Sequence, residues 1–349
     1  MVEKTELAPG FWISRIIKGG WQLSQGHGQA AGTDPVEDMF AFADAGITTF
    51  DCADIYTGVE ELIGRFLALQ KKRLGHQTGV RVLTKLVPDY DALPTINRTY
   101  VRKIIDRSLQ RLRMERLDMV QYSWWNYDVP GWIDTGYWLM ELQKEGKIEL
   151  VSATNFNTKH TREILEAGIK LATMQVQYSL LDQRPEKELA ALCATHGVGL
   201  LCYGTLAGGF FSERWLGVNE PQAPLANRSL VKYKLMIDEF GGWELFQALL
   251  KVLDSIARSK QVCIANVASR YILDSRSVAG VIIGATHAKH LEANIKTFEL
   301  ALNEKDMAAI NEVLARQKQQ DGDVFDKERI KEGAHGKIMK YNLNSLQAD

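Results

Sequence analysis

Three residues with proton-transfer chemistry lie at or near the ends of two short apolar runs. The run ITTFD ends in Asp51, Tyr56 follows five residues later, and the run VRVLTK ends in Lys85. If the runs are neighbouring strands, the Asp51 carboxylate can pair with the Lys85 ammonium, which would lower the pKa of a nearby Tyr56 phenol. Such a phenol can give or take a proton near neutral pH. The alternative is a buried ion pair beside a surface tyrosine.

Further polar and aromatic residues follow other apolar runs. The run LDMVQY leads into Ser123, Trp124 and Trp125, an aromatic stretch typical of a pocket wall. In barrels of alternating strands and helices, catalytic groups stand at the carboxyl ends of the strands. The residues that close or follow the other runs are therefore candidates for the same site: Thr154, Asn155, Gln175, Tyr178 and Tyr203.

The runs that carry these residues alternate with amphipathic segments along most of the chain. Most runs are continuously apolar, as expected of parallel strands that are covered on both faces. The pattern predicts an α/β fold, a (β/α)8 TIM barrel forming a single domain over residues 1–349, with a doubly wound sheet as the alternative. The eight predicted strands are residues 15–20, 47–51, 80–85, 117–122, 147–153, 173–178, 198–203 and 278–284.

Two segments interrupt this alternation. Residues 205–241 are predicted to be a long loop after the seventh strand, and a loop of this length at the active face of a barrel usually covers a ligand. Residues 318–349 follow the last barrel helix as a C-terminal tail, either frayed or folded as a lid. Phe325, Ile338 and Met339 favour packing of this tail against the barrel.

Composition excludes several classes of protein. The chain has 349 residues, of which 46% are apolar and 24% charged, as in ordinary globular proteins. A net charge of −1 gives no field that would attract nucleic acid. The four cysteines form no CxxC pair, which argues against a metal site and favours a reducing compartment, the cytoplasm. The sequence shows neither a signal peptide nor an apolar stretch that would cross a membrane.

Six motifs, in order along the chain, resemble those of the aldo-keto reductase family over about residues 12–315. The segment GITTFDCADIYTGVEELIG resembles the family's N-terminal signature, and VLTKL resembles its lysine strand. Four later blocks match as well: VSATNFNT, QVQYSLLDQRPEKEL, LLCYGTLAGGFF and VIIGATHAKHLEANI. The resemblance implies a barrel that binds a nicotinamide cofactor without a GxGxxG loop and interconverts aldehydes or ketones with alcohols.

By this resemblance, Tyr56 protonates the carbonyl oxygen, Lys85 tunes Tyr56, and Asp51 holds Lys85. Thr154, Asn155 and Gln175 should hold the carboxamide of the cofactor, and Tyr203 should stack on the nicotinamide ring. Small residues let the backbone approach the pyrophosphate closely, and the positions implied here are Gly204, Leu206, Gly208 and Gly209.

The last block, which begins near Gly284, should contact the adenosine end of the cofactor. The residues implied are Thr286, His290 and Asn294, with His287 and Lys289 close by. Without an arginine, the 2′-phosphate would meet weaker ligands, although NADP(H) is still favoured over NAD(H). Alternatively, the two histidines are plain surface residues.

The chain departs from the family pattern at Ser123, where most relatives carry a histidine. Serine donates one hydrogen bond but carries no charge, and it leaves space beside the substrate. Trp21, Trp124, Trp125 and Tyr127 could form aromatic walls, which suit sugar rings and apolar carbonyls equally, and the alternative for the tryptophans is packing in the core. The serine favours a sugar or another polyhydroxylated carbonyl compound as the substrate.

The predicted activity is therefore an NAD(P)(H)-dependent oxidoreductase that acts on a small carbonyl or alcohol. One alternative is a weakly catalytic protein that binds the cofactor as a sensor or partner subunit. A barrel glycosidase would need two carboxylates at strand ends, and the runs closing at Ser123 and Tyr203 do not supply them.

Overall fold

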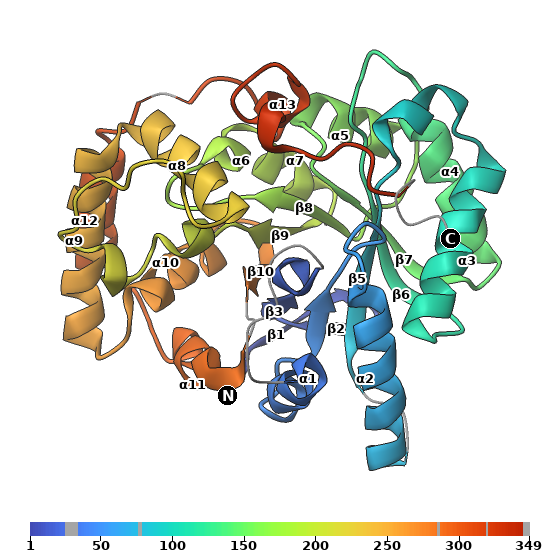
Figure 1. Cartoon of the computed structure of the whole chain (residues 1–349), viewed down its shortest axis with the longest axis horizontal. Helices are drawn as coiled ribbons and strands as arrows, with labels where there is room; N and C mark the ends of the chain where they lie inside the picture. Colours follow the sequence, from blue (N-terminus) through green and yellow to red (C-terminus); the bar gives the residue numbers. More distant parts are fainter. Residues whose placement is uncertain (25–33, 76–78, 285–286, 319, 345–349) are drawn as a thin grey trace.

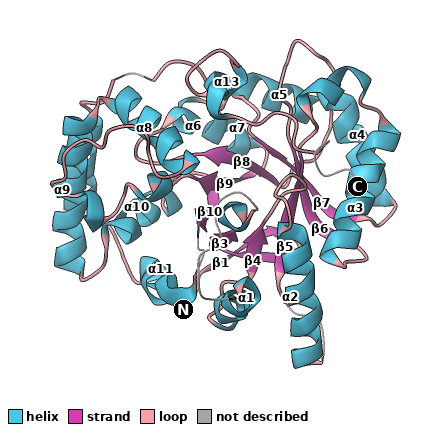
Figure 2. Ribbon diagram, in the orientation of Figure 1, coloured by secondary structure: helices cyan, strands magenta, loops and turns pink. Residues whose placement is uncertain are grey.

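The computed structural model describes residues 1–24, 34–75, 79–284, 287–318 and 320–344. Its centre is a closed parallel barrel in the order β10-β3-β4-β5-β6-β7-β8-β9 (Figure 1; Figure 2). All eight predicted strands are confirmed, and the doubly wound alternative is wrong because β10 pairs with β3 and closes the sheet. The strands are β3 (Ile16–Gly19), β4 (Thr49–Asp51), β5 (Arg81–Leu86), β6 (Leu117–Tyr122), β7 (Ile148–Thr154), β8 (Thr173–Gln177), β9 (Gly199–Tyr203) and β10 (Val278–Gly284).

An antiparallel hairpin, β1 (Lys4–Ala8) and β2 (Phe11–Ser14), covers the end of the barrel where the strands begin. Phe11 and Ile13 are buried in a cluster with Ile17, Leu83 and other inward-facing strand residues. The Arg81 guanidinium, at the start of β5, lies 4.2 Å from the centre of the Phe11 ring. The open, functional end is therefore the opposite one.

Helices surround the barrel, and their ends follow the local sequence. The Asp34 carboxylate caps α1 by accepting a hydrogen bond from Val36 N at 3.0 Å, and Pro35 begins that helix. Most of the helices that pack on the barrel present an apolar stripe to the strands. They are α1 (Pro35–Asp44), α2 (Val59–Leu74), α3 (Arg98–Leu112), α4 (Trp132–Lys144), α5 (Thr158–Glu166), α6 (Arg184–Lys187), α7 (Leu189–Thr195), α9 (Trp243–Lys260), α10 (Ile264–Leu273), α11 (Leu291–Ile295) and α12 (Glu304–Leu314).

The sequence predicted a loop over the whole segment 205–241. This is wrong for its second half, because residues Arg228–Phe240 form the helix α8. The Asn227 side chain caps it by accepting a hydrogen bond from Leu230 N at 2.9 Å. Leu230, Tyr233 and Ile237 are buried on one face, so burial of that stripe stabilises the helix. The preceding part contains short 3-10 turns at Ala207–Gly209 and Glu213–Trp215.

The C-terminal segment crosses the open end of the barrel, from the side of α12 to the side of α3, and includes α13 (Asp326–Arg329) (Figure 1). Its far part is fixed by hydrogen bonds from Tyr90 N to Tyr341 O and from Asn344 N to Asp89 Oδ1, both 2.8 Å long. The packed form of this tail is therefore the one observed. Across the described ranges, no helix is both long and apolar enough to cross a membrane.

Candidate active site

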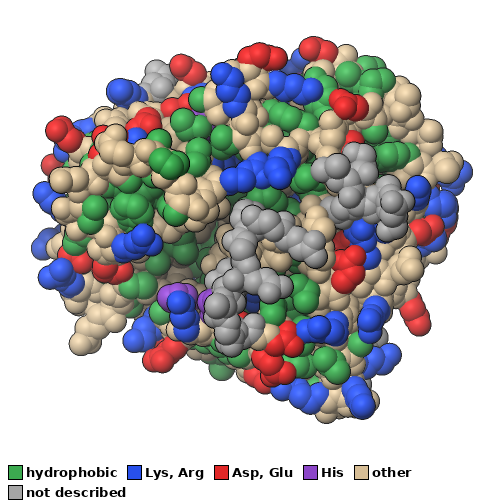
Figure 3. Space-filling model, viewed as in Figure 1, with side chains coloured by type: hydrophobic (Ala, Val, Ile, Leu, Met, Phe, Trp, Pro, Cys, Tyr) green, Lys and Arg blue, Asp and Glu red, His purple; other side chains and the backbone are tan. Residues whose placement is uncertain are grey.

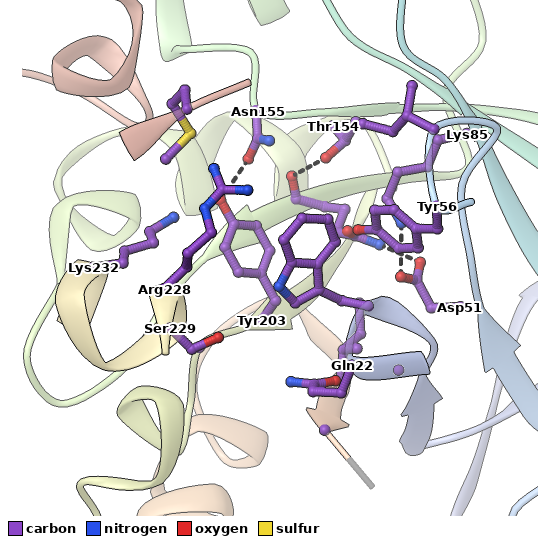
Figure 4. A pocket seen from close by; sticks show the side chains of 18 of the residues that line it. Gln22, Asp51, Tyr56, Lys85, Thr154, Asn155, Tyr203, Arg228, Ser229 and Lys232 are labelled. Carbon is purple, nitrogen blue, oxygen red and sulfur yellow. Dashed lines mark hydrogen bonds and ion pairs between the residues drawn. The ribbon is translucent and has the colours of Figure 1, made fainter. Parts of the chain in front are cut away.

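A cavity of about 460 Å³ opens at the carboxyl ends of the barrel strands. Its walls come from strand ends, from α8 and from the C-terminal segment, and Figure 4 shows side chains from these elements that point into it. The structure brings most of the predicted site residues together here: Trp21, Asp51, Tyr56, Lys85, Ser123, Trp124, Trp125, Thr154, Asn155, Gln175, Tyr203, Gly204, Leu206, Gly208, Gly209 and Gly284 all line the cavity.

The predicted pair of charges forms at the floor of the cavity. Lys85 Nζ lies 2.7 Å from Asp51 Oδ2 and donates a second hydrogen bond to Cys52 O at 2.8 Å. The same nitrogen lies 5.2 Å from the centre of the Tyr56 ring (Figure 4). Because β4 and β5 are neighbours, the three groups form one compact unit at the ends of two strands.

Burial dominates the acid–base properties of this unit. It raises the pKa of Tyr56 to about 12, although the Lys85 ammonium lowers it. Burial alone would lower the pKa of Lys85, but the Asp51 carboxylate, with the neighbouring Tyr56 and Cys52, more than offsets this and raises the pKa above its usual value. The lowering of the Tyr56 pKa by the ammonium, which we expected, is present, but burial outweighs it, so the net pKa is raised and not lowered. Tyr56 is protonated at neutral pH, as a proton donor must be.

Two glutamine side chains complete the surroundings of the Asp51 carboxylate. Asp51 Oδ1 accepts hydrogen bonds from Gln121 Nε2 at 3.1 Å and from Gln175 Nε2 at 2.7 Å. Gln175, predicted to hold a cofactor carboxamide, is thus also part of the network that orients the charge pair. Sequence analysis missed Gln121. It could have been found, because a residue two positions before Ser123 shares the inward face of β6.

Tyr203 and Asn155 form a second polar unit on the opposite wall. Tyr203 Oη donates to Asn155 Oδ1 at 2.9 Å, and the Lys232 ammonium lies 5.2 Å from the Tyr203 ring centre. Asn155 has a φ of 61°, a left-handed conformation that asparagine tolerates better than most residues. Thr154 Oγ1 donates to the backbone oxygen of Gln175 at 3.2 Å. The arrangement leaves the Tyr203 ring as a flat surface in the cavity.

The glycines after β9 make room for α8. A Cβ atom at Gly208, where φ is 62°, would lie 2.7 Å from Tyr233 Cδ2 and 3.1 Å from Ser229 O. The close approach brings Arg228, Ser229 and Lys232 of α8 into the cavity wall (Figure 4). Sequence analysis missed these three residues because their segment was interpreted as a loop.

Positive charge gathers at the mouth of the cavity. Arg228, Lys232 and Lys340 line it, although Lys232 also lies 3.5 Å from the buried Glu328 carboxylate. Asp51, paired with Lys85, is the only acidic residue among the described lining residues. Figure 3 shows Lys and Arg side chains near the centre of this face of the molecule. Such a surface favours an anionic group, including the phosphates of a nucleotide.

The residues predicted at the adenosine end lie apart from the cavity walls, except for Gly284. His290 is exposed and Asn294 half-buried, and neither lines the cavity. His287 Nδ1 lies 3.6 Å from Asp38 Oδ2, and Ala288 N donates to Asp38 Oδ1 at 2.8 Å. Thr286 lies outside the described residues. Asp38 thus fixes the start of this block, a contact that the sequence did not predict.

Ser123 has a hydroxyl group with spare hydrogen-bonding capacity. Its Oγ is buried and has no hydrogen-bond partner among the described residues, although its backbone N donates to Leu86 O at 3.1 Å. Ser123 lines the cavity, where a substrate oxygen could satisfy its hydroxyl. Trp21 packs edge-on against Tyr56 at 5.0 Å between ring centres.

The aromatic wall differs in one residue from the prediction. Trp124 and Trp125 reach the cavity, and the indole nitrogen of each is held by a backbone carbonyl. Trp124 Nε1 donates to Val129 O and Trp125 Nε1 to Pro88 O, both at 2.8 Å. Tyr127 does not line the cavity, because its ring is stacked on His160 with 3.4 Å between centres. The missing apolar surface comes from the C-terminal segment, through Phe325, Ile338, Met339 and Leu343.

The described residues contain no group of three His, Cys, Asp or Glu side chains placed to hold a metal ion. The cavity instead combines a buried proton donor, a flat aromatic surface and a basic mouth. These features fit an extended organic cofactor with phosphate groups beside a small substrate.

Comparison with known proteins gives a consistent result. A model of the aldo/keto reductase family matches residues 15–315. The NADH-specific methylglyoxal reductase of Escherichia coli (strain K12) is 24% identical over 324 residues, which cover 86% of this chain and 94% of that protein. The L-glyceraldehyde 3-phosphate reductase of the same organism is 26% identical over 290 residues, 78% of this chain and 81% of that protein.

Solved structures share the fold. The glycerol dehydrogenase of Gluconobacter oxydans has a TM-score of 0.72 at 24% identity, with 90% of this chain and 95% of that chain covered. A thermostable aldo-keto reductase solved with the inhibitor epalrestat has a TM-score of 0.67 at 21% identity, with 89% and 99% covered. At these identities the structural likeness supports the barrel fold.

Proposed function

This chain belongs to the aldo/keto reductase family, and from that premise we propose that it interconverts an aldehyde or ketone and the corresponding alcohol with a nicotinamide cofactor. The observation that carries the proposal is the unit of Asp51, Lys85 and Tyr56 at the floor of the cavity. The cofactor, when bound, supplies or accepts the hydride at C4 of its nicotinamide ring.

The chain's own residues would supply the proton and the orientation. Tyr56 donates its phenolic proton to the carbonyl oxygen during reduction, and the Lys85 ammonium stabilises the phenolate that results. Asp51 keeps Lys85 in place at 2.7 Å and keeps it charged. In the reverse direction the same phenolate accepts the proton of the alcohol.

The cavity walls fit such a cofactor. The Tyr203 ring offers a stacking surface, and Thr154, Asn155 and Gln175 lie beside it as polar groups for the carboxamide. The turn at Gly208 brings the backbone close to α8, whose Arg228 and other basic residues suit the pyrophosphate.

We propose NADP(H) as the preferred cofactor, with NAD(H) as the alternative. Exposed Lys289 and His290 could meet a 2′-phosphate beyond Gly284, and Asn294 lies one helical turn further on. The alternative is supported by the name of one relative, an NADH-specific methylglyoxal reductase. Fluorescence titration with NADPH and NADH separates the two.

For the substrate we propose a small carbonyl or alcohol with further hydroxyl groups, including a sugar. The free Oγ of Ser123 can donate to or accept from a substrate oxygen, and the half-buried indole of Trp21 suits a sugar ring or an apolar carbonyl. A reducing compartment such as the cytoplasm is proposed from the four unpaired cysteines.

A second candidate is a weakly catalytic protein that binds the cofactor as a sensor or partner subunit. It is favoured by Ser123, which provides no charge where most relatives carry a histidine. The two candidates differ in turnover and share cofactor binding.

One experiment tests both candidates. The purified protein is titrated with NADPH and NADH, and aldehydes, ketones and sugars are then screened in both directions by nicotinamide absorbance. We expect cofactor binding and turnover, with turnover lost in Tyr56→Phe. Binding with no turnover above that of Tyr56→Phe would favour the sensor, and the absence of cofactor binding would contradict both.

A further inference from the structure

Arg329, in the C-terminal segment, joins two loops that carry different parts of the cavity. Its Nη2 donates hydrogen bonds to Trp124 O at 3.1 Å and to Asn155 O at 2.6 Å. These carbonyl groups follow β6 and β7, which are neighbours in the barrel. Only 9% of the Arg329 side chain is exposed, so its contacts are made largely out of water.

Each of the two loops has a separate task in the proposed reaction. The loop after β6 carries Ser123, which lines the cavity and whose buried hydroxyl has no hydrogen-bond partner among the described residues. The loop after β7 carries Asn155, whose Oδ1 accepts from the Tyr203 hydroxyl and so contacts the proposed stacking surface. Arg329 therefore links the substrate wall to the cofactor wall through one nitrogen atom.

The link matters most at Asn155, because this residue has a left-handed φ of 61°. Asparagine tolerates that region better than most residues but still adopts it less readily than the right-handed one, so neighbouring contacts help to hold it there. A guanidinium bonded to the Asn155 carbonyl is such a contact. Without it, the peptide could relax and move the side-chain amide away from Tyr203.

Arg329 is itself held rigidly by the segment that carries it. Its Nη1 donates to Phe325 O at 3.0 Å, and its guanidinium lies 4.2 Å from the centre of the Tyr127 ring. The planar fork thus has one face on an aromatic ring and its nitrogen atoms on three backbone carbonyls. A lysine has the charge but not the fork, so it cannot reproduce this set of bonds.

We propose that Arg329 is a positioning residue for the oxidoreductase reaction: it keeps the Asn155 and Ser123 loops in register, so that cofactor and substrate meet Tyr56 together. The inference rests on the proposed function. It goes beyond the family match, which ends at residue 315, because Arg329 belongs to the segment that follows.

The test compares Arg329→Ala and Arg329→Lys with a control on the same helix, Lys327→Ala. Lys327 pairs with Glu239 at 2.8 Å and does not line the cavity, so its loss loosens α13 without freeing either loop. Each variant is measured for thermal unfolding, cofactor affinity, and separate kcat and KM values with the best substrate of the panel.

We expect Arg329→Ala to bind the cofactor about tenfold more weakly and to lose kcat by up to about 10²-fold, because small misplacements at a reacting centre have large effects. Arg329→Lys should fall between the wild-type protein and the alanine variant, and Lys327→Ala should stay within about twofold of wild type. Millimolar guanidinium chloride should restore part of the lost kcat in Arg329→Ala alone, measured against equal sodium chloride.

Three results would overturn the proposal. The first is that Arg329→Ala folds and has the same kcat and cofactor affinity as Lys327→Ala. The second is that Arg329→Ala and Lys327→Ala lose activity only in proportion to the fraction of each protein that is unfolded. If Arg329→Ala does not fold, Arg329→Lys decides, and wild-type kinetics in that variant would also reject the role. The cofactor titration of the wild-type protein distinguishes failure of this proposal from failure of the proposed function. If the wild-type protein binds no cofactor, the proposed function itself is rejected.

Discussion

Lys85 Nζ and Asp51 Oδ2 lie 2.7 Å apart at the ends of adjacent strands, and each side chain is only 5% exposed. A buried ion pair of this kind is costly to break from one side, because the remaining charge stays in a poor solvent. Here the side-chain amides of Gln121 and Gln175 both donate hydrogen bonds to Asp51 Oδ1, whereas Lys85 bonds to Oδ2, so removing Lys85 would take away the hydrogen bond to Oδ2. A variant at Lys85 should therefore lose stability as well as activity, and both have to be measured.

Replacing Lys85 by methionine should abolish most of the activity, and thermal unfolding of the variant shows how much of this loss comes from reduced stability. The ammonium lowers the pKa of Tyr56, so its loss raises that pKa further above about 12 and destabilises the phenolate formed in reduction. We expect kcat to fall by about 10²- to 10⁴-fold, the range usual for general acid–base groups. Steady-state kinetics in both directions provide the measurement.

The pH dependence of alcohol oxidation gives a sharper check of the same variant. Oxidation needs the Tyr56 phenolate, so its rate should rise with pH over the range in which the protein is stable, and Lys85→Met should shift this rise to higher pH. Unchanged kinetics, or a shift to lower pH, would contradict the assigned role. Tyr56→Phe, which has no proton to transfer, is the control.

The barrel and the charge pair could be predicted because each depends on local sequence. Continuous apolar runs such as LDMVQY identify buried parallel strands, and a polar residue that closes a run falls at the functional end. The hairpin of β1 and β2 was not predicted, since its residues alternate in burial without a strongly apolar run. The helix α8 was missed because a stretch rich in glycine and proline precedes it.

The rest of the site depends on contacts between distant segments. Arg228 and Lys232 line the cavity because Gly208 lets α8 approach, and nothing near them in sequence indicates this. Arg329 meets Trp124 and Asn155 only because the C-terminal segment crosses the barrel. The pKa of Tyr56 was misjudged for a similar reason: charge pairing is visible in sequence order, but the extent of burial is not.

Replacing Gly208 by alanine should weaken cofactor binding through α8. The added Cβ would lie 2.7 Å from Tyr233 Cδ2 and 3.1 Å from Ser229 O, so α8 and its Arg228 must shift. We expect the cofactor to bind at least about tenfold more weakly, a change of about 1.4 kcal/mol, measured by fluorescence titration.

Gly217→Ala is the matched control for this change. Gly217 has a φ of 72°, close to the 62° of Gly208, but a Cβ there would meet no atom within 4 Å. Both variants should therefore lose about 1–2 kcal/mol of stability from backbone strain. Only Gly208→Ala should lose cofactor affinity, and an equal loss in both would show that α8 does not contact the cofactor.

Replacing Ser123 by histidine tests whether the serine sets substrate choice. A histidine would provide a positioned donor for a simple carbonyl, worth about 10²-fold in rate where such donors act, and would fill the space beside the serine hydroxyl. We expect turnover of simple aldehydes to rise and turnover of the best polyhydroxylated substrate to fall. The measurement is kcat/KM for both substrates.

Ser123→Ala completes the comparison at this position. It keeps the space but removes the Oγ, so it should reduce the rate with the polyhydroxylated substrate while leaving simple aldehydes nearly unchanged. If neither variant alters the ratio of the two kcat/KM values, Ser123 is not a specificity residue.

Asp54, two residues before Tyr56, should make the stability of the fold depend on pH. Its side chain is fully buried, and burial raises its pKa from 3.8 to about 7 despite hydrogen bonds from Asn344 and Val87. Asn344 Nδ2 donates to Asp54 Oδ2 at 2.9 Å, and Val87 N lies 3.2 Å from both carboxylate oxygens. The protonated form is therefore the one that the folded protein favours.

The direction in which pH changes the stability follows from proton binding at Asp54. Between pH 3.8 and about 7 the folded protein binds more protons at Asp54 than the unfolded chain, so the free energy of unfolding falls as pH rises. The stabilisation is complete below the unfolded pKa and is lost as pH rises through the folded one. About three pKa units correspond to roughly 4 kcal/mol, which is the largest effect to expect.

Urea unfolding of the wild-type protein and of Asp54→Asn, at about pH 5 and about pH 8, measures this contribution by difference. The asparagine cannot ionise, so every other titrating group cancels in the comparison. We expect the difference in unfolding free energy, Asp54→Asn minus wild type, to be larger at the higher pH than at the lower one. The reason is that only the wild-type protein must bury a charged carboxylate at the higher pH. A difference that does not change with pH would mean that Asp54 is ionised throughout, with Asn344 and Val87 sufficient to stabilise its charge.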